Sequence, residues 1–143
     1  EIIDNYFLQY PKVKEFMDKS INDARENGYV ETILGRKRHL KDINSRNAVV
    51  RGYAERNAIN APIQGAAADI IKVAMIDVQD AITQKGYKSK MLLQVHDELV
   101  FDIYLPELEE IQKLIKDKME QAVSLSVPLE VDLGTGENWL QAH

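Results

Sequence analysis

The stretch from residue 91 to residue 103 constrains the fold most, because two runs of alternating apolar residues flank a short charged break. With a period of two, the apolar residues before the break share one face of a strand, and those after it share one face of a second strand: Met91, Leu93 and Val95, then Leu99, Phe101 and Ile103. The break itself is His96-Asp97-Glu98. The pattern therefore predicts a β-hairpin with these three ionisable residues at its tip.

The ionisable tip suggests a bound cation, since neighbouring carboxylates repel one another unless positive charge lies close to them. A divalent metal held by Asp97 and Glu98 is the simplest candidate. Two other interpretations stay open from these residues alone. The tip can be a solvated turn, or His96 and Asp97 can belong to the metal ligands of a phosphohydrolase.

The composition is that of a globular chain. Its 143 residues suffice for about one domain with a buried core. No run approaches the ~18 apolar residues of a membrane span, and residues 1–4 lack the pattern of a signal peptide. The absence of cysteine excludes disulfides and cysteine nucleophiles, and it fits a reducing compartment. Since the chain starts without Met and inside a helical pattern, we expect it to be a piece of a longer protein.

The formal net charge of -5 hides an uneven distribution of charge. Residues 36–56 contain seven Lys or Arg and two acidic residues, whereas residues 97–137 contain eleven acidic residues and three Lys. The acidic average argues against nucleic-acid binding by the whole domain. The distribution still allows one basic surface for a polyanion and one acidic region for metal or solvent.

Helical spacing of apolar residues accounts for much of the chain. We expect two helices in residues 2–27, separated at Pro11. We also expect a long helix through residues 54–81, which Pro62 kinks and residues 85–87 end. A further helix begins at Pro106. Their apolar faces supply the core that an α/β fold with a half-buried hairpin requires.

Two other segments are expected to be extended. Residues 28–35 carry strand-forming side chains between two glycines and lead into a basic knuckle at residues 36–39. This knuckle can be solvated charge or a set of phosphate contacts through Arg36 and Arg38. Alternation in residues 129–133 predicts a last strand.

The long helix carries a row of polar side chains. Arg56, Asn60 and Gln64 are spaced by four residues, which places them along one side of the helix. Such side chains can donate hydrogen bonds to the minor-groove acceptors that every base pair presents. An ordinary polar helix face has the same pattern, so both interpretations stay open here.

The sequence resembles the C-terminal part of the bacterial family A DNA polymerases. The matching motifs occur in the same order and cover nearly the whole chain. The resemblance is carried by residues 28–32 with 35–38, residues 55–69, residues 94–99, and the closing residues 128–131 and 136–139. It implies an α/β fold with a palm-type antiparallel sheet, in which residues 1–45 belong to the fingers and residues 46–143 form most of the palm.

The resemblance also implies roles for individual residues. Asp97 would help to bind the catalytic Mg²⁺ ions, Glu98 would support that metal site, and His96 would lie close to the primer end. Arg36 and Arg38 resemble contacts to the duplex backbone, and the row on the long helix resembles contacts to the minor groove and primer-template: Arg56, Asn60 and Gln64.

The implied partners are primer-template DNA, deoxynucleoside triphosphates and the remainder of the polymerase chain, in the bacterial cytoplasm. The family's motif A, with its second metal-binding Asp, and its motif B are missing from the sequence. We therefore expect the isolated chain to be inactive, with the two-metal site completed by residues outside it. Lys41 stands where the family usually has Pro.

Two alternatives from other classes remain. The chain can be a duplex-DNA-binding fragment without catalytic activity. It can also be a His-Asp metal phosphohydrolase, for which only His39, His96 and His143 are available as histidine ligands.

Overall fold

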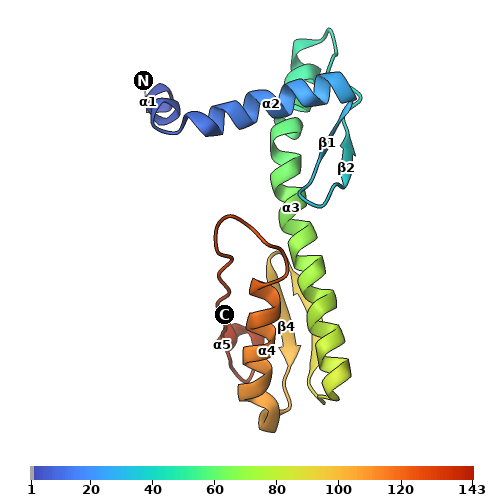
Figure 1. The fold of residues 1–143 in the computed structure, drawn as a ribbon, viewed down its shortest axis with the longest axis vertical. Helices are drawn as coiled ribbons and strands as arrows, with labels where there is room; N and C mark the ends of the chain where they lie inside the picture. Colours follow the sequence, from blue (N-terminus) through green and yellow to red (C-terminus); the bar gives the residue numbers. More distant parts are fainter. Residues whose placement is uncertain (1) are drawn as a thin grey trace. The chain divides into compact units, whose positions relative to one another are not determined.

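The computed structural model describes residues 2–143 and divides into two compact units, residues 1–69 and residues 70–143 (Figure 1). Glu1, the first residue of the expected fingers segment, lies outside the described residues. The expected boundary between fingers and palm at residues 45 and 46 stays a prediction. Each unit has its own core, and one helix contributes residues to both.

The first unit begins with the two expected helices. Helix α1 spans Ile2–Gln9 and α2 spans Pro11–Asn27, so the break falls at Pro11 as predicted. Gly28 ends α2 in the left-handed conformation, with a φ of 78°, and its amide donates to the carbonyl of Ala24. The reversal of the chain at Gly28 leads directly into the first strand.

A short antiparallel ribbon follows, made of β1 (Tyr29–Glu31) and β2 (Lys37–His39). The ribbon was expected, but its basic residues were expected on a loop, and that placement is wrong for Lys37 and Arg38. The positive φ of Gly35 completes the reversal before them, so both pair with β1 as part of a strand.

The core of the first unit joins α2, β1, the loop after β2 and the first half of α3. Its buried residues are Ala24, Val30, Leu40, Ile43, Ala54 and Ala58. Several of these are alanines, so helix and ribbon approach one another closely.

Helix α3 spans Ala48–Lys85, so it begins earlier than expected and ends at Lys85 as predicted, and its helical conformation continues through Pro62. Asn47 explains the early start, because its Oδ1 accepts hydrogen bonds from the amides of Val49 and Val50. At the other end, Gly86 has a φ of 69° and its amide donates to the carbonyl of Thr83.

The second unit contains the predicted hairpin, formed by β3 (Lys90–Val95) and β4 (Glu98–Asp102). One detail of the prediction is wrong. A bulge at Leu92 shifts the register, so that Met91 pairs with Phe101 but Leu93 pairs with Val100. Beyond the bulge, Leu93 therefore leaves the face of Met91 and is 44% exposed.

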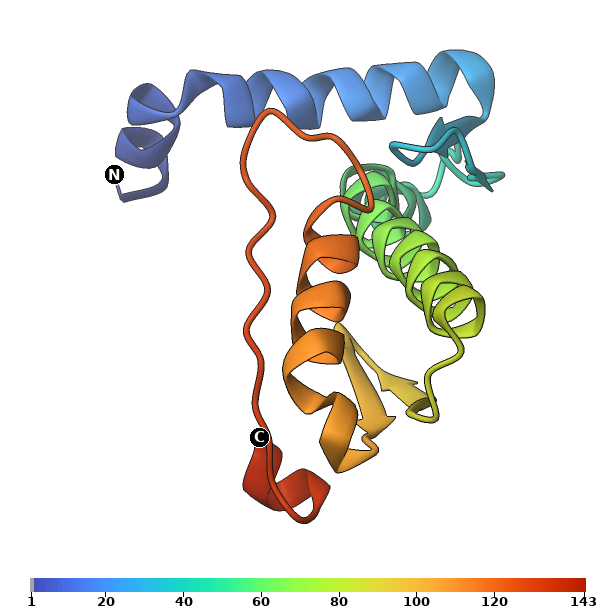
Figure 2. The same ribbon diagram turned by 60° about the horizontal axis from the view of Figure 1, so that its bottom comes forward.

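Helix α4 (Leu108–Glu120) packs over this hairpin after the short 3-10 turn η1 (Leu105–Glu107), as Figure 2 shows. The core between them and the end of α3 contains Val78, Ile82, Ile111 and Ile115, with Phe101 and Ile103 packed against it. The expected apolar face of the second strand is thus confirmed for Phe101 and Ile103.

The strand expected in residues 129–133 is not formed, and α5 (Trp139–Ala142) ends the chain. Alternation alone does not make a strand, because the backbone groups also need a neighbouring strand edge. The amide of Val131 instead donates to Oε1 of Glu120.

The mixed α/β class, with small antiparallel sheets packed against helices, is confirmed. Among residues 2–143, no helix is both long enough and apolar enough to cross a membrane.

Candidate functional site

The hairpin tip holds three of the predicted site residues in sequence. Val95 and Glu98 pair across the strands, so His96 and Asp97 form a two-residue turn. His96 has a φ of 52° and is the only non-glycine residue with positive φ in the described part of the chain. Two-residue hairpin turns favour such a conformation, which most side chains resist. The side-chain amide of Gln94 donates to the carbonyl of His96 and holds it in place.

The two carboxylates at the tip differ in their surroundings. Asp97 is exposed. The side chain of Glu98 is 38% exposed, and its Oε1 lies 2.9 Å from Nδ1 of His143. The structure therefore brings His143 to the tip, which sequence reasoning did not predict. No periodic pattern links residues 98 and 143, so only the folded tail could reveal this contact.

The tip fits part of a metal site. Carboxylate oxygens are the ligands that Mg²⁺ prefers. Because Asp97 is exposed, its oxygens are accessible to a cation from solvent. Among residues 2–143, no group of three or more His, Asp or Glu side chains is placed to hold a metal. The tip can therefore contribute ligands to a metal site but needs further ligands to complete it.

The predicted polar row on α3 is formed as expected. Arg56, Asn60 and Gln64 all lie on the exposed side of this helix, within the first unit. The guanidinium of Arg56 lies 5.9 Å from the ring centre of Tyr53 on the preceding turn. The row presents donors to solvent and can meet a polar surface.

The ribbon presents cations in the same unit. Lys37 and Arg38 are exposed on β2. Nζ of Lys37 lies 4.4 Å from the ring centre of Tyr29, and its hydrogen bond with Tyr29 raises the pKa of Lys37 above the ordinary value. Lys37 therefore stays cationic, as Arg38 does.

Arg36 differs from its two neighbours, because part of its guanidinium is already bonded. Its Nε donates to Oδ1 of Asp69 over 2.9 Å, and its Nη2 donates to the carbonyl of Gly65 over 3.2 Å. The side chain is still 53% exposed. Sequence reasoning placed Arg36 among the candidate phosphate contacts but did not foresee its bond to Asp69.

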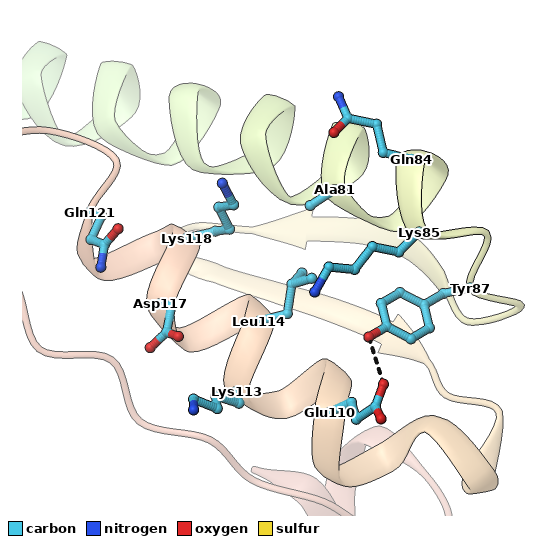
Figure 3. A pocket seen from close by; sticks show the side chains of 10 residues that line it. All are labelled: Ala81, Gln84, Lys85, Tyr87, Glu110, Lys113, Leu114, Asp117, Lys118 and Gln121. Carbon is cyan, nitrogen blue, oxygen red and sulfur yellow. Dashed lines mark hydrogen bonds between the residues drawn. The ribbon is translucent and has the colours of Figure 1, made fainter.

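A groove of about 720 Å³ lies between the end of α3 and α4, at a different place in the second unit from the hairpin tip. Figure 3 shows its lining, which includes Lys85, Lys113 and Lys118 together with the apolar Leu114. The hydroxyl of Tyr87 donates to Oε2 of Glu110 over 3.0 Å, and this bond raises the pKa of Tyr87. None of the predicted site residues lines this groove.

Glu107, at the end of η1, is bonded to the segment before β3. Its carboxylate accepts hydrogen bonds from the amides of Lys88 and Ser89 and from the Ser89 hydroxyl. Burial alone raises the pKa of Glu107, but these bonds outweigh burial and lower the pKa below its ordinary value. Oγ of Ser89 also accepts from the amide of Tyr104, so this cluster joins both outer ends of the hairpin to η1, the turn before α4.

Comparison with known proteins agrees with the sequence motifs. The sequence model of DNA polymerase family A matches residues 1–141. DNA polymerase I of Lactococcus lactis subsp. cremoris is 53% identical over 140 residues, covering 98% of this chain and 16% of that protein. DNA polymerase I of Streptococcus pneumoniae serotype 4 is 54% identical with the same coverage.

A solved structure is similar throughout the chain. It is the POL domain of Pol1 from M. smegmatis in complex with a DNA primer-template and dNTP, with a TM-score of 0.95 and 47% sequence identity. The match covers 98% of this chain and 25% of that one.

These matches define the chain as polymerase sequence with a polymerase fold. The chain belongs to DNA polymerase family A, and it spans about 16% of the length of the bacterial relatives named above.

Proposed function

We propose that the chain supplies one part of the active site and part of the duplex-binding surface of a DNA-directed DNA polymerase. The reaction is template-directed, metal-dependent transfer of a nucleotide to a primer 3′ end, in DNA replication or repair in the bacterial nucleoid. The observation that carries the proposal is the pair of adjacent carboxylates on a hairpin tip in a chain of this family.

The hairpin provides a stiff support for charge. Asp97 is the proposed ligand of Mg²⁺, Glu98 supports the same site, and His96 is the proposed neighbour of the primer end. When bound, two Mg²⁺ ions stabilise the charge on the attacking and leaving oxygens. The protein's own contribution is to hold Asp97 at a fixed turn, where His96 adopts a conformation that few side chains accept.

The contact between Glu98 and His143 supports a division of roles between the carboxylates. Oε1 of Glu98 already has a partner 2.9 Å away, whereas Asp97 is exposed at the turn. Asp97 is therefore proposed as the direct ligand, and Glu98 as the residue that sets the charge and orientation around it.

The first unit is proposed to bind primer-template DNA. Arg36 and Arg38 contact phosphates of the duplex backbone, while the row of Arg56, Asn60 and Gln64 contacts the minor groove. Exposure of all these side chains supports this role. Minor-groove acceptors are nearly degenerate, so such a row senses the shape of a base pair and not its sequence.

The remaining metal ligands and the deoxynucleoside triphosphate site are proposed to come from other parts of a polymerase chain. The described residues contain no third carboxylate or imidazole positioned to complete the metal site. We therefore expect the 143-residue chain by itself to bind Mg²⁺ weakly and to add no nucleotide.

Single-turnover primer extension tests the assignment of the tip in the complete natural protein that carries these residues. Asp97→Asn should lower the extension rate by about a thousandfold or more, because it removes an anionic metal ligand. Glu98→Gln should cost less, since a supporting residue acts through others. DNA affinity, measured alongside by fluorescence anisotropy, should change little in either variant.

Asp102→Asn is the matched control, because Asp102 is an exposed carboxylate on the same hairpin at the end far from the tip. Near-normal extension by Asp97→Asn would overturn its assignment as a metal ligand. Efficient extension by the 143-residue chain alone would overturn the claim that the site needs further residues.

A further inference from the structure

The turn between β1 and β2 is bonded to α3 through one buried carboxylate. Asp69 is only 7% exposed, and its Oδ1 accepts the bond from Nε of Arg36. Its Oδ2 accepts a hydrogen bond from the Thr32 hydroxyl. A buried charge is stable only when it is paired and hydrogen-bonded. The turn supplies the partners of this carboxylate, and the carboxylate in turn bonds the turn to α3.

The turn itself is closed by bonds that begin and end on the same residues. The amide of Arg36 donates to the Thr32 hydroxyl over 3.1 Å, and the amide of Thr32 donates to the carbonyl of Arg36 over 3.0 Å. Gly35 adopts a φ of 80° between them. Thr32 and Arg36 therefore form one rigid turn that holds Asp69 from two sides.

Gly65 permits this close approach of turn and helix. A Cβ atom at Gly65 would overlap Cγ2 of Thr32, so any larger residue must displace the Thr32 side chain that bonds to Asp69. The carbonyl of Gly65 also accepts the bond from Nη2 of Arg36. Helix and turn are thus in contact at Gly65 and bonded at Asp69.

We propose that Asp69, together with Thr32, is a positioning residue for duplex binding, which fixes Arg36 and the basic ribbon at a set place beside the polar row of α3. The inference rests on the proposed function, because it concerns the surface proposed there to bind DNA. Asp69 contacts no DNA itself, being buried.

The geometry explains why fixing Arg36 matters. A guanidinium has five N–H donors in a planar fork, and the bonds to Asp69 and Gly65 occupy one part of it. The other part stays in solvent, where it can reach a phosphate without first losing side-chain freedom. The same turn leads directly into Lys37 and Arg38, so its position also sets theirs.

Asp69→Asn gives a test in which simple electrostatics and positioning predict opposite changes in duplex affinity. Removal of an acidic charge near a DNA surface should strengthen binding if charge alone matters. Positioning predicts that duplex affinity falls by about tenfold. It also predicts that the slope of log affinity against log salt becomes shallower by about one phosphate contact, or ~0.9. Both are measured by anisotropy titrations with a primer-template duplex and the complete natural protein.

Asp80→Asn is the matched control, because it removes the same charge from an exposed site on the same helix. Its duplex affinity should stay the same or rise slightly. Circular dichroism and a thermal melt verify that each variant is folded at the titration temperature. Equal or stronger duplex binding by folded Asp69→Asn would overturn the inference.

Two further variants keep the test valid if Asp69→Asn does not fold. Thr32→Val keeps the shape of the side chain but removes the hydroxyl that donates to Asp69, and Gly65→Ala displaces the Thr32 side chain. Both should weaken duplex binding and make the salt slope shallower. Normal binding and a normal slope in both variants would overturn the inference.

A double substitution separates this inference from the proposed function. Arg36→Gln should weaken duplex binding, and adding Asp69→Asn to it should cause no further loss, because the two residues act as one unit. If Arg36→Gln and Arg56→Ala both bind normally, the proposed function fails and the inference falls with it. If both weaken binding while Asp69→Asn does not, the inference alone is overturned.

Discussion

At the scale of single residues, His96 combines a proposed site with backbone strain. A non-glycine residue at positive φ costs on the order of 1–3 kcal/mol, and the surrounding hairpin must supply that energy. Such strain is often found at functional sites, where a side chain must point in a direction that an unstrained backbone would not give. Glycine at this position would lack both Cβ and the imidazole, whereas alanine would lack only the imidazole. The two substitutions therefore separate backbone strain from the role of the side chain.

We predict that His96→Gly stabilises the fold by about 1 kcal/mol while it lowers the rate of primer extension. Relief of ~1–3 kcal/mol of strain exceeds the ~0.4–1 kcal/mol that the greater freedom of glycine in the unfolded chain costs. Urea denaturation and single-turnover extension measure the two effects.

His96→Ala is the matched control, since it also removes the imidazole but keeps the strained Cβ. It should lower extension like His96→Gly without the gain in stability. A His96→Gly variant no more stable than His96→Ala would contradict the strain argument.

Glu107 gives a second prediction at this scale, which concerns pH. Because the pKa of Glu107 is lower in the folded protein than in the unfolded chain, its ionised form stabilises the fold. This contribution is complete above the ordinary pKa of a glutamate and is lost as the pH falls through the lowered pKa. Glu107→Gln should therefore be less stable than the natural protein near neutral pH, and the difference should shrink in acid.

Urea denaturation at a series of pH values measures this difference. Glu109→Gln is the control, because Glu109 is an exposed acidic residue nearby, in the first turn of α4. A stability difference for Glu107→Gln that stays constant as the pH falls would argue against the proposed role of its hydrogen bonds.

At the scale of elements, the sequence predicted which helices and strands form better than it predicted their exact bounds and pairing. Pro11, Gly28 and Gly86 act through their own backbone preferences, so the ends of α2 and α3 follow from local chemistry. The bulge at Leu92 could not be predicted in this way, because it depends on which residues pair across the hairpin.

The same distinction holds for the candidate site. The tip residues and the row on α3 follow from spacing along one element, and the structure places them as that spacing requires. The bonds between Arg36 and Asp69 and between Glu98 and His143 join residues far apart in sequence, with no periodic pattern to connect them. Contacts of this kind arise from packing of whole elements and are accessible only from the fold.

At the scale of the whole molecule, the two units differ in charge. Residues 1–69 contain eleven Lys or Arg against ten acidic residues, whereas residues 70–143 contain seven against thirteen. The first unit is thus close to neutral overall, with its cations gathered in residues 36–56, and the second is strongly acidic. The local cluster of positive charge proposed to attract a polyanion therefore lies in residues 36–56 of the first unit.

We predict that duplex binding by the complete protein weakens steeply with salt and shows little preference for sequence. Each phosphate contact releases counterions, so several contacts by Lys or Arg should lower affinity by more than tenfold between 50 and 200 mM salt. Titrations with two duplexes of unrelated sequence, each at several salt concentrations, measure both effects. Salt-independent binding, or a strong preference for one duplex, would contradict the local-cluster interpretation.

The bulge at Leu92 makes the number of residues in the hairpin as important to its structure as their identity. Gain or loss of one codon between Met91 and His96 would exchange the two faces of the strand beyond that point and turn the tip toward a different side. We therefore predict that related proteins differ in side chains along this hairpin more readily than in its length. Alignments of related polymerases should be free of gaps from residue 90 to residue 102, with insertions tolerated instead in the irregular stretch around residues 121–137.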